Sequence, residues 1–252
     1  MNIKSPGVDQ YTIRHWPLEG TQNLRDVGGY DTIDDLSTRW GVLMRSDSLH
    51  KLPLESQGRL IYFGVRTVID LRTEMETATA PDVFARSNKV AYIHLPMLAP
   101  HIVELHRADT LEELNRLLVD RCQNQIALVV SLLAEENRTP ALVHCSAGKD
   151  RTGLVIATLL DLVGVDRATI VEDYVQTRYY MQNLTLDLRS AAAQIGFDLE
   201  RLDRMLECRA DVMERTLRYI DERYGGTAEY VRAAGVDQET IARLRENLVH
   251  GA

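Results

Sequence analysis

The sequence predicts an α/β protein, with a central, mostly parallel sheet flanked by helices and a helical C-terminal part. Up to about residue 164, short β-branched apolar runs alternate with longer segments of helical periodicity. This alternation is typical of parallel strands joined by helical connections. After Gly164 the pattern is helical to the end, with breaks near Gly196 and at Gly225 and Gly226.

The N-terminal part is expected to contribute an arm, a strand and a short helix. Residues 1–20 are polar and carry Pro and Gly, which predicts an extended arm on the surface. A strand is expected over 40–45, and a helix from Pro53 to Gly64. Proline suits the first turn of a helix and glycine suits its end.

The middle of the chain supplies the remaining strands. Runs over 65–71 and 90–95 are rich in β-branched and apolar residues, as buried strands are. Apolar residues then recur at helical spacing over 110–136. A further short strand over 141–143 is followed by a long apolar helix over 154–163. We expect all 252 residues to form one domain, whose helical C-terminal part covers about 165–252.

Composition narrows the classes of function. The net charge is −8 and no block of Lys and Arg interrupts it, so neither nucleic acid nor an acidic membrane surface is an expected partner. The N-terminus lacks an apolar signal-like core, and no run approaches the ~18 apolar residues of a membrane span. We therefore expect no integral membrane segment. The sequence does not indicate an oligomeric state.

Cysteine usage favours the cytoplasm. The three cysteines are odd in number and widely separated, and no CxxC pair is present, so neither a zinc knuckle nor a disulfide framework is predicted. Cys122 and Cys208 are expected to be small packing residues. The spacing of His94, His101 and His106 matches no recognised metal site.

The remaining cysteine, Cys145, lies in a loop that also carries two glycines, a lysine and an arginine. The stretch HCSAGKDRTG, from His144 to Gly153, joins the strand over 141–143 to the following helix. Unpaired backbone N–H groups and the positive end of the helix dipole suit such a turn to an anion.

Cys145 and Arg151 are separated by five residues, with Gly148 between them. In a tight loop this spacing brings a thiol and a guanidinium to the same bound group. Arginine binds phosphate in a bidentate manner, and positive surroundings favour the nucleophilic thiolate over the thiol. The loop therefore predicts a phosphate site with a nucleophile.

This stretch resembles the signature loop of the cysteine-dependent protein tyrosine phosphatase superfamily. The segments NLRDVGGY, RSDSL, VIDLRTEME and YGGTAEYV are further similar to the bacterial tyrosine/serine protein phosphatase family. The resemblance implies a tyrosine phosphatase-like fold and hydrolysis of phosphomonoesters, phosphotyrosine above all, with relaxed activity on phosphoserine and phosphothreonine. It implies no metal and no cofactor. Some family members hydrolyse phosphoinositides, so the expected partner is a phosphoprotein or a phosphoinositide.

The resemblance also implies residue roles. Cys145 is the nucleophile that forms a phosphocysteine, and Arg151 binds and orients the phosphoryl group. Thr152 matches the hydroxyl that assists the cysteine as leaving group, and His144 matches the histidine that orders the loop. The main-chain N–H groups of the loop complete the phosphate cradle, and they belong to Ser146, Ala147, Gly148, Lys149, Asp150 and Arg151.

The expected general acid departs from the conventional pattern. Conventional tyrosine phosphatases carry an acidic residue after the strand that precedes the signature loop, but residues 94–101 contain no carboxylate. Protonation of the leaving group needs an acid near the ester oxygen. Asp150 is the first candidate, as in the resembling enzymes, with a salt bridge or helix cap as its alternative role. Glu104 and Asp109 are the other candidates, if the segment after Pro100 folds over the pocket.

Two further basic residues have open roles. Lys149 is expected to recognise a second phosphate, as on an inositol ring, to pair with Asp150, or to lie exposed at the loop rim. Arg72, with Asn23 and its neighbours, is expected to line the pocket wall or to form ion pairs that brace the loop from behind. A phosphate-binding module without turnover is the alternative from another class. The Cys145–Arg151 pair argues against it, because binding alone needs no nucleophile.

Overall fold

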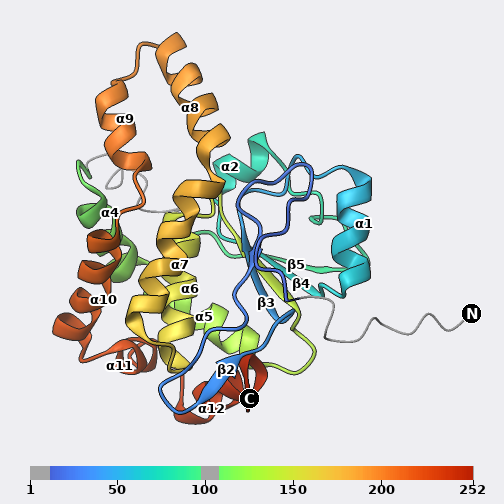
Figure 1. The fold of residues 1–252 in the computed structure, drawn as a ribbon, viewed down its shortest axis with the longest axis vertical. Coiled ribbons are helices and arrows are strands. Elements are labelled where there is room, and N and C mark those ends of the chain that lie inside the picture. Colours follow the sequence, from blue (N-terminus) through green and yellow to red (C-terminus); the bar gives the residue numbers. More distant parts are fainter. Residues whose placement is uncertain (1–11, 98–107, 252) are drawn as a thin grey trace, which may run out of the picture.

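The computed structural model describes residues 12–97 and 108–251. Its main sheet has the order β1-β3-β6-β4-β5 (Figure 1). The strands are β1 (Arg25–Asp26), β3 (Leu43–Ser46), β6 (Ala141–His144), β4 (Thr67–Asp70) and β5 (Ala91–His94). The last four run parallel, and β1 pairs antiparallel with β3. The predicted α/β class with a mostly parallel sheet is confirmed.

Both faces of the parallel strands are buried. Successive residues alternate between two apolar clusters, with Leu43, Ile69 and Val143 in one and Met44, Val68 and Leu142 in the other. Strands covered on both sides appear in sequence as continuous apolar runs, which is why they were recognisable. The register also aligns the carboxyl ends of the strands, so that Ser46 and Asp70 lie beside His144.

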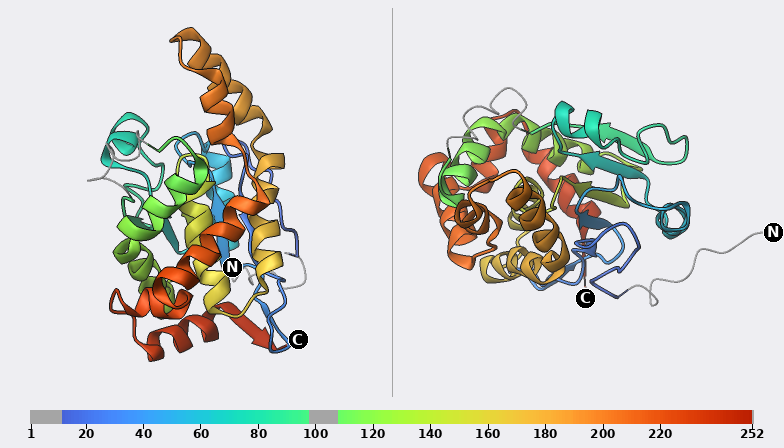
Figure 2. Two further views of the ribbon diagram at one scale, coloured as in Figure 1. Left: turned by 90° about the vertical axis from the view of Figure 1, so that its left-hand side faces the viewer. Right: turned by 90° about the horizontal axis from the view of Figure 1, so that it is seen from above.

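Helices cover the sheet unequally. The larger cluster packs under helices that lie mostly on one side of the sheet (Figures 1 and 2). They are α4 (Leu111–Arg121), α5 (Gln123–Ala134), α6 (Asp150–Leu162), α7 (Arg167–Tyr180), α10 (Ala210–Tyr224), α11 (Thr227–Arg232) and α12 (Gln238–Leu248). The other face is covered by α1 (Leu54–Phe63). As predicted, α1 follows Pro53 and ends at Gly64, whose φ of 104° suits glycine. The short helix α2 (Glu74–Thr79) follows β4.

A helical hairpin projects from this body. Helices α8 (Gln182–Gln194) and α9 (Leu199–Leu206) extend away from the sheet and pack on each other (Figures 1 and 2). Ala192 is the buried residue of α8, and α9 buries none.

Three expectations about element bounds are corrected. The chain is not helical to its end, because β7 (Val249–Gly251) pairs antiparallel with β2 (Leu36–Thr38), a partner far away in sequence. The strand expected over 40–45 begins only at Leu43, since Gly41 adopts a left-handed turn with φ of 73°. The helical segment over 110–136 is divided at Cys122 into α4 and α5, which meet at a bend of 66°.

Among the described residues, no single helix is long and apolar enough to cross a membrane. Only α4 and α5 taken together reach the required length and composition, across their bend.

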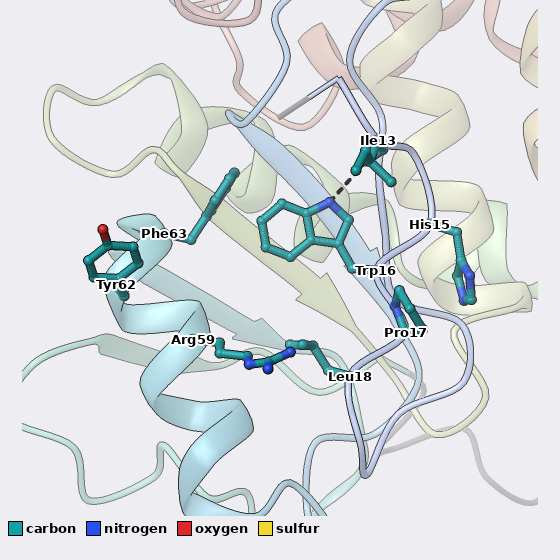
Figure 3. Close-up of a pocket in the computed structure, with 8 residues that line it drawn as sticks. All are labelled: Ile13, His15, Trp16, Pro17, Leu18, Arg59, Tyr62 and Phe63. Carbon is teal, nitrogen blue, oxygen red and sulfur yellow. Dashed lines mark hydrogen bonds between the residues drawn. The ribbon is translucent and has the colours of Figure 1, made fainter. Parts of the chain in front are cut away.

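The described part of the N-terminal arm packs against α1. The Trp16 ring meets the Phe63 ring edge to face at 4.2 Å between centroids. An apolar pocket of about 360 Å³ lies between residues 13–18 and α1 (Figure 3). None of its lining residues belongs to the loop HCSAGKDRTG. Residues 1–11 of the predicted arm lie outside the described residues.

Candidate active site

The loop that follows β6 is shaped by one glycine. Cys145 to Lys149 connect β6 to α6, which begins at Asp150. Gly148 has a φ of 67°, and a Cβ atom there would lie 2.4 Å from the carbonyl oxygen of Ser46. Both the left-handed backbone and this close approach require glycine. The loop is thus packed against the carboxyl end of β3.

The loop carbonyls are bonded to side chains behind the loop. Asn23 Nδ2 donates to the carbonyl oxygens of Ala147 at 3.0 Å and Gly148 at 3.1 Å. Arg45 Nη2 donates to the carbonyl of Gly148 at 2.7 Å. These bonds fix the orientation of the peptide groups.

The loop N–H groups remain available. Within 12–97 and 108–251, no acceptor takes a hydrogen bond from the backbone N–H groups of residues 146–151. Two of them, at Asp150 and Arg151, belong to the first turn of α6, where the helix dipole is positive. The arrangement is that of an anion cradle.

A buried ion-pair network supports Arg45. Asp173 on α7 accepts from Arg25 Nε at 3.1 Å and from Arg45 Nη1. Burial raises the pKa of Asp173, but the charges of both arginines outweigh it and hold that pKa well below its ordinary value. Burial and the charge of Arg45 lower the pKa of Arg25 to about 10. The network ties the loop to α7 through Arg45.

A second buried group lies behind His144. Arg72 donates to Asp70 at 2.7 Å and to the Ser48 hydroxyl at 2.8 Å, and its side chain is 2% exposed. The structure therefore places Arg72 in a buried ion pair with Asp70, and its expected role in bracing the loop stays a prediction.

The ring of His144 is held between the loop and two carboxylates. Its Nδ1 lies 3.2 Å from the carbonyl oxygen of Cys145, and its Nε2 lies 3.2 Å from Asp82 and 3.7 Å from Asp70. A carbonyl oxygen only accepts, so Nδ1 is the donor in that contact. His144 thus lies in the buried interior, between the loop and these carboxylates.

Asp70, Asp82 and His144 are also close enough together to act as metal ligands. However, the Arg72 guanidinium lies 2.7 Å from Asp70 and 3.7 Å from Asp82. A protein cation therefore already compensates these carboxylates, and the group fits a structural ion-pair cluster better than a metal site.

The structure brings Cys145 and Arg151 together and adds a partner. Arg151 forms a bidentate ion pair with Glu76 of α2, Nη1 to Oε2 at 2.7 Å and Nη2 to Oε1 at 2.8 Å. The Ser146 hydroxyl donates to the same carboxylate. Burial lowers the pKa of Arg151, but the bonds to Glu76 and the negative charges of Cys145, Glu76 and Asp150 together raise it above its ordinary value.

Glu76 itself is held ionised. Burial raises its pKa, but the bonds and charge of Arg151, with the bond from Ser146, lower it well below the ordinary 4.5. The carboxylate also closes a capping box with Thr73 at the start of α2. The sequence pattern did not indicate Glu76 as a site residue. The spacing Thr73-x-x-Glu76 would have indicated the helix start, but nothing local indicated Arg151 as its partner.

The remaining loop residues occupy distinct environments. Asp150 is 23% exposed at the start of α6, and its carboxylate lies 3.3 Å from the Lys149 ammonium. The Thr152 hydroxyl is buried and has no hydrogen-bond partner within the described part of the chain. Lys149 is 2% exposed, so the expectation that it lies exposed at the rim is wrong.

Of the two alternative acids, Asp109 is the one that the structure describes. Asp109 is 80% exposed and pairs with Arg201 at 3.4 Å. Glu104 lies outside the described residues, as do His101 and His106.

Comparisons with known proteins identify the family of the chain. A model described as the tyrosine phosphatase family matches residues 16–250. The triple specificity protein phosphatase PtpB of Mycobacterium tuberculosis is 32% identical over 272 residues, covering 90% of this chain and 96% of its own. A tyrosine-protein phosphatase of Nostoc commune is 30% identical over 215 residues, covering 81% and 73%. A crystal structure of P. aeruginosa TpbA is 23% identical and covers 69% of this chain and 92% of its own, with a TM-score of 0.34. Because the family model spans nearly the whole chain and includes the strand–loop–helix unit of Cys145 and Arg151, the chain belongs to the tyrosine phosphatase family.

Proposed function

We propose that this tyrosine phosphatase hydrolyses phosphotyrosine in proteins through a phosphocysteine intermediate, with relaxed activity on phosphoserine and phosphothreonine. The observation that carries the proposal is the cradle of free N–H groups over residues 146–151, with Cys145 and Arg151 at the same loop. During transfer from an oxygen to another nucleophile, a phosphoryl group is stabilised mainly by its own positioning and by hydrogen-bond donors directed at its equatorial oxygens.

In the first step the Cys145 thiolate attacks phosphorus, a sulfur–phosphorus bond forms and the ester bond breaks. The leaving phenol or alcohol takes a proton from Asp150. In the second step water attacks phosphorus, Asp150 recovers the proton, and phosphate leaves as the thiolate re-forms. Arg151 and the loop N–H groups hold the equatorial oxygens throughout, and the Thr152 hydroxyl donates to the departing thiolate.

The name of the mycobacterial relative, triple specificity protein phosphatase, supports the relaxed specificity proposed here. Phosphoinositide hydrolysis is the second candidate. A neighbouring ring phosphate needs a second cation, and the Lys149 ammonium is bonded to backbone carbonyls of residues 205 and 207. This observation favours a monophosphate substrate.

The deciding experiment compares the native enzyme with Cys145→Ser on p-nitrophenyl phosphate, and then on phosphopeptides and phosphoinositides. Loss of turnover with retained phosphate binding is expected for the serine variant, since hydroxyl is a far weaker nucleophile than thiolate. Retained turnover would refute the mechanism, and phosphate binding by a native protein without turnover would identify a binding module. A strong preference for inositol phosphates would favour the second candidate.

Asp150→Asn tests the acid separately. We expect slow turnover of an alkyl phosphate, whose leaving group needs a proton, and near-normal turnover of an aryl phosphate with an acidic phenol. Equal effects on both would exclude Asp150, and Glu104→Gln and Asp109→Asn are then the variants to measure.

The proposed location is the cytoplasm. Support comes from Cys145 and Cys208, which are buried and form no disulfide within the part of the chain that the structure describes. Fractionation of cells that express the tagged full-length chain tests this location, and recovery in the medium would contradict it.

A further inference from the structure

The side chain of Lys149 lies at the base of the α8–α9 hairpin. Its Nζ donates to the carbonyl oxygen of Met205 and, at 3.1 Å, to that of Glu207. The same nitrogen lies 3.3 Å from the Asp150 carboxylate. An ammonium group has three donors. Two of them are used by the carbonyls, and the Asp150 carboxylate compensates the charge at ion-pair distance, so the ammonium is directed to the hairpin base.

The two carbonyls belong to the end of a helix. Met205 lies in the last turn of α9, and Glu207 is its C-cap, with extended backbone at φ −58° and ψ 147°. The final carbonyls of a helix lack intrahelical partners, and the negative end of the helix dipole favours a cation. The Lys149 ammonium supplies both a hydrogen-bond donor for these carbonyls and a positive charge at this end of the helix.

Among the described residues, further polar contacts join the hairpin to the body. The Leu184 N–H at the start of α8 donates to Gln22 Oε1 at 2.9 Å, and Arg201 of α9 donates to the carbonyl of Ala108 at 3.3 Å. An open cavity of about 520 Å³ lies at the hairpin base, lined by residues of α7, α8, α9 and 206–209. Polar bonds and the buried side chains of Met181 and Cys208 thus hold the base beside this cavity.

One of those attachments also leads to the loop. Gln22 precedes Asn23, whose amide holds the carbonyls of Ala147 and Gly148. The start of the hairpin is therefore connected to the loop through residues 22 and 23, and its end is connected directly through Lys149.

We propose that Lys149 is a positioning residue that anchors the base of the α8–α9 hairpin to the phosphate loop, so that the two move as one unit. The proposal rests on the proposed function only in that phosphate binds in this loop. Coupling between two sites is reciprocal. Phosphate that orders the loop should therefore also order residues 205–208, and any molecule that shifts the hairpin base should change phosphate affinity.

Hydrogen exchange on the full-length native enzyme, with and without saturating inorganic phosphate, tests the coupling. We expect phosphate to slow exchange of the amides at 205–208. In Lys149→Met, which keeps the length of the side chain without its donors, this slowing should disappear. Phosphate affinity should fall by less than about tenfold, because the lost ammonium does not touch phosphate.

Arg189→Gln is the matched control. Arg189 forms an ion pair with Asp203 inside the hairpin, between α8 and α9, and both of these residues lie outside the loop HCSAGKDRTG. Its loss removes one hairpin cation but should leave the phosphate-dependent slowing at 205–208 intact.

Three results would contradict the proposal that Lys149 anchors the hairpin base to the loop. They are unchanged or faster exchange at 205–208 when phosphate binds the native enzyme, retained slowing in Lys149→Met, and a loss of phosphate affinity in Lys149→Met as large as that in Arg151→Lys. The first needs no variant, so it decides the question even if Lys149→Met does not fold. Failure of the proposed function would instead appear as turnover that survives Cys145→Ser, which leaves the exchange result unaffected.

Discussion

Replacement of Glu76 by glutamine is expected to slow the enzyme while leaving its fold intact. Glu76 accepts both terminal nitrogens of Arg151 at 2.7 and 2.8 Å. Glutamine keeps one carbonyl oxygen as an acceptor but replaces the other oxygen with a donor, which cannot accept from Arg151. Arg151 would then lose one bond and the charge that fixes its orientation at the loop.

The size of the effect follows from these bonds. A hydrogen bond to a charged group contributes about 1.5–3 kcal/mol. If that energy is lost from the placement of Arg151 in the transition state, kcat falls by roughly 10- to 150-fold. Because the pKa of Glu76 lies well below the ordinary 4.5, the carboxylate is ionised above that pH, and the effect should be constant from about pH 5 to pH 8.

Steady-state kinetics on p-nitrophenyl phosphate, with thermal unfolding to verify the fold, provide the assay. Glu74→Gln is the matched control, since Glu74 lies exposed in the first turn of the same helix. An unchanged or higher kcat in Glu76→Gln would refute the reasoning. It would mean that the carboxylate competes with substrate for Arg151 and does not position it.

Three further predictions concern the buried residues Asn23, Asp173 and Asp26. Asn23→Ala leaves the Ala147 carbonyl without its donor, while the Gly148 carbonyl keeps Arg45. The KM for p-nitrophenyl phosphate should therefore rise, while the midpoint of thermal unfolding should change little; an unchanged KM would contradict the role of Asn23 in shaping the cradle. Asp173→Asn leaves two buried arginines without their counter-charge and should cost about 3–5 kcal/mol in urea unfolding, and a loss below about 1 kcal/mol would contradict this. Burial raises the pKa of Asp26 from 3.8 to about 6, despite bonds from two backbone N–H groups. The folded state therefore binds the proton more tightly, and this group should lower native stability by about 2 kcal/mol as pH rises from 4 to 6. Asp26→Asn should lack this fall in urea titrations across that range, and an identical pH profile would refute it.

The sequence predicted the elements whose signals are local. The apolar runs over 65–71 and 90–95 correspond to β4 and β5, because strands buried on both faces need apolar residues at successive positions. Pro53 and Gly64 bounded α1 for reasons of backbone conformation that apply in any fold. β7 was missed because its partner β2 lies about 210 residues earlier in the chain.

The same distinction holds at the site. Cys145 and Arg151 were found from sequence because six consecutive peptide units bring both to one anion, whatever lies around them. Their supports come from elsewhere: Glu76 is 75 residues from Arg151, and Asp173 is 128 from Arg45. With 29 basic and 37 acidic residues in the chain, local spacing does not select these pairs.

Lys149 shows most directly what the tertiary structure decided. From sequence its ammonium had three open roles, and neighbouring residues favoured none of them strongly. The structure gives it backbone carbonyls at the end of α9, which carry no side-chain signature and are therefore invisible in a sequence. Sequence alone determined which residues form the phosphate loop, because that loop is one continuous segment. Only the fold decided which distant groups hold it in place, because burial and the strand order select those partners from many of like charge.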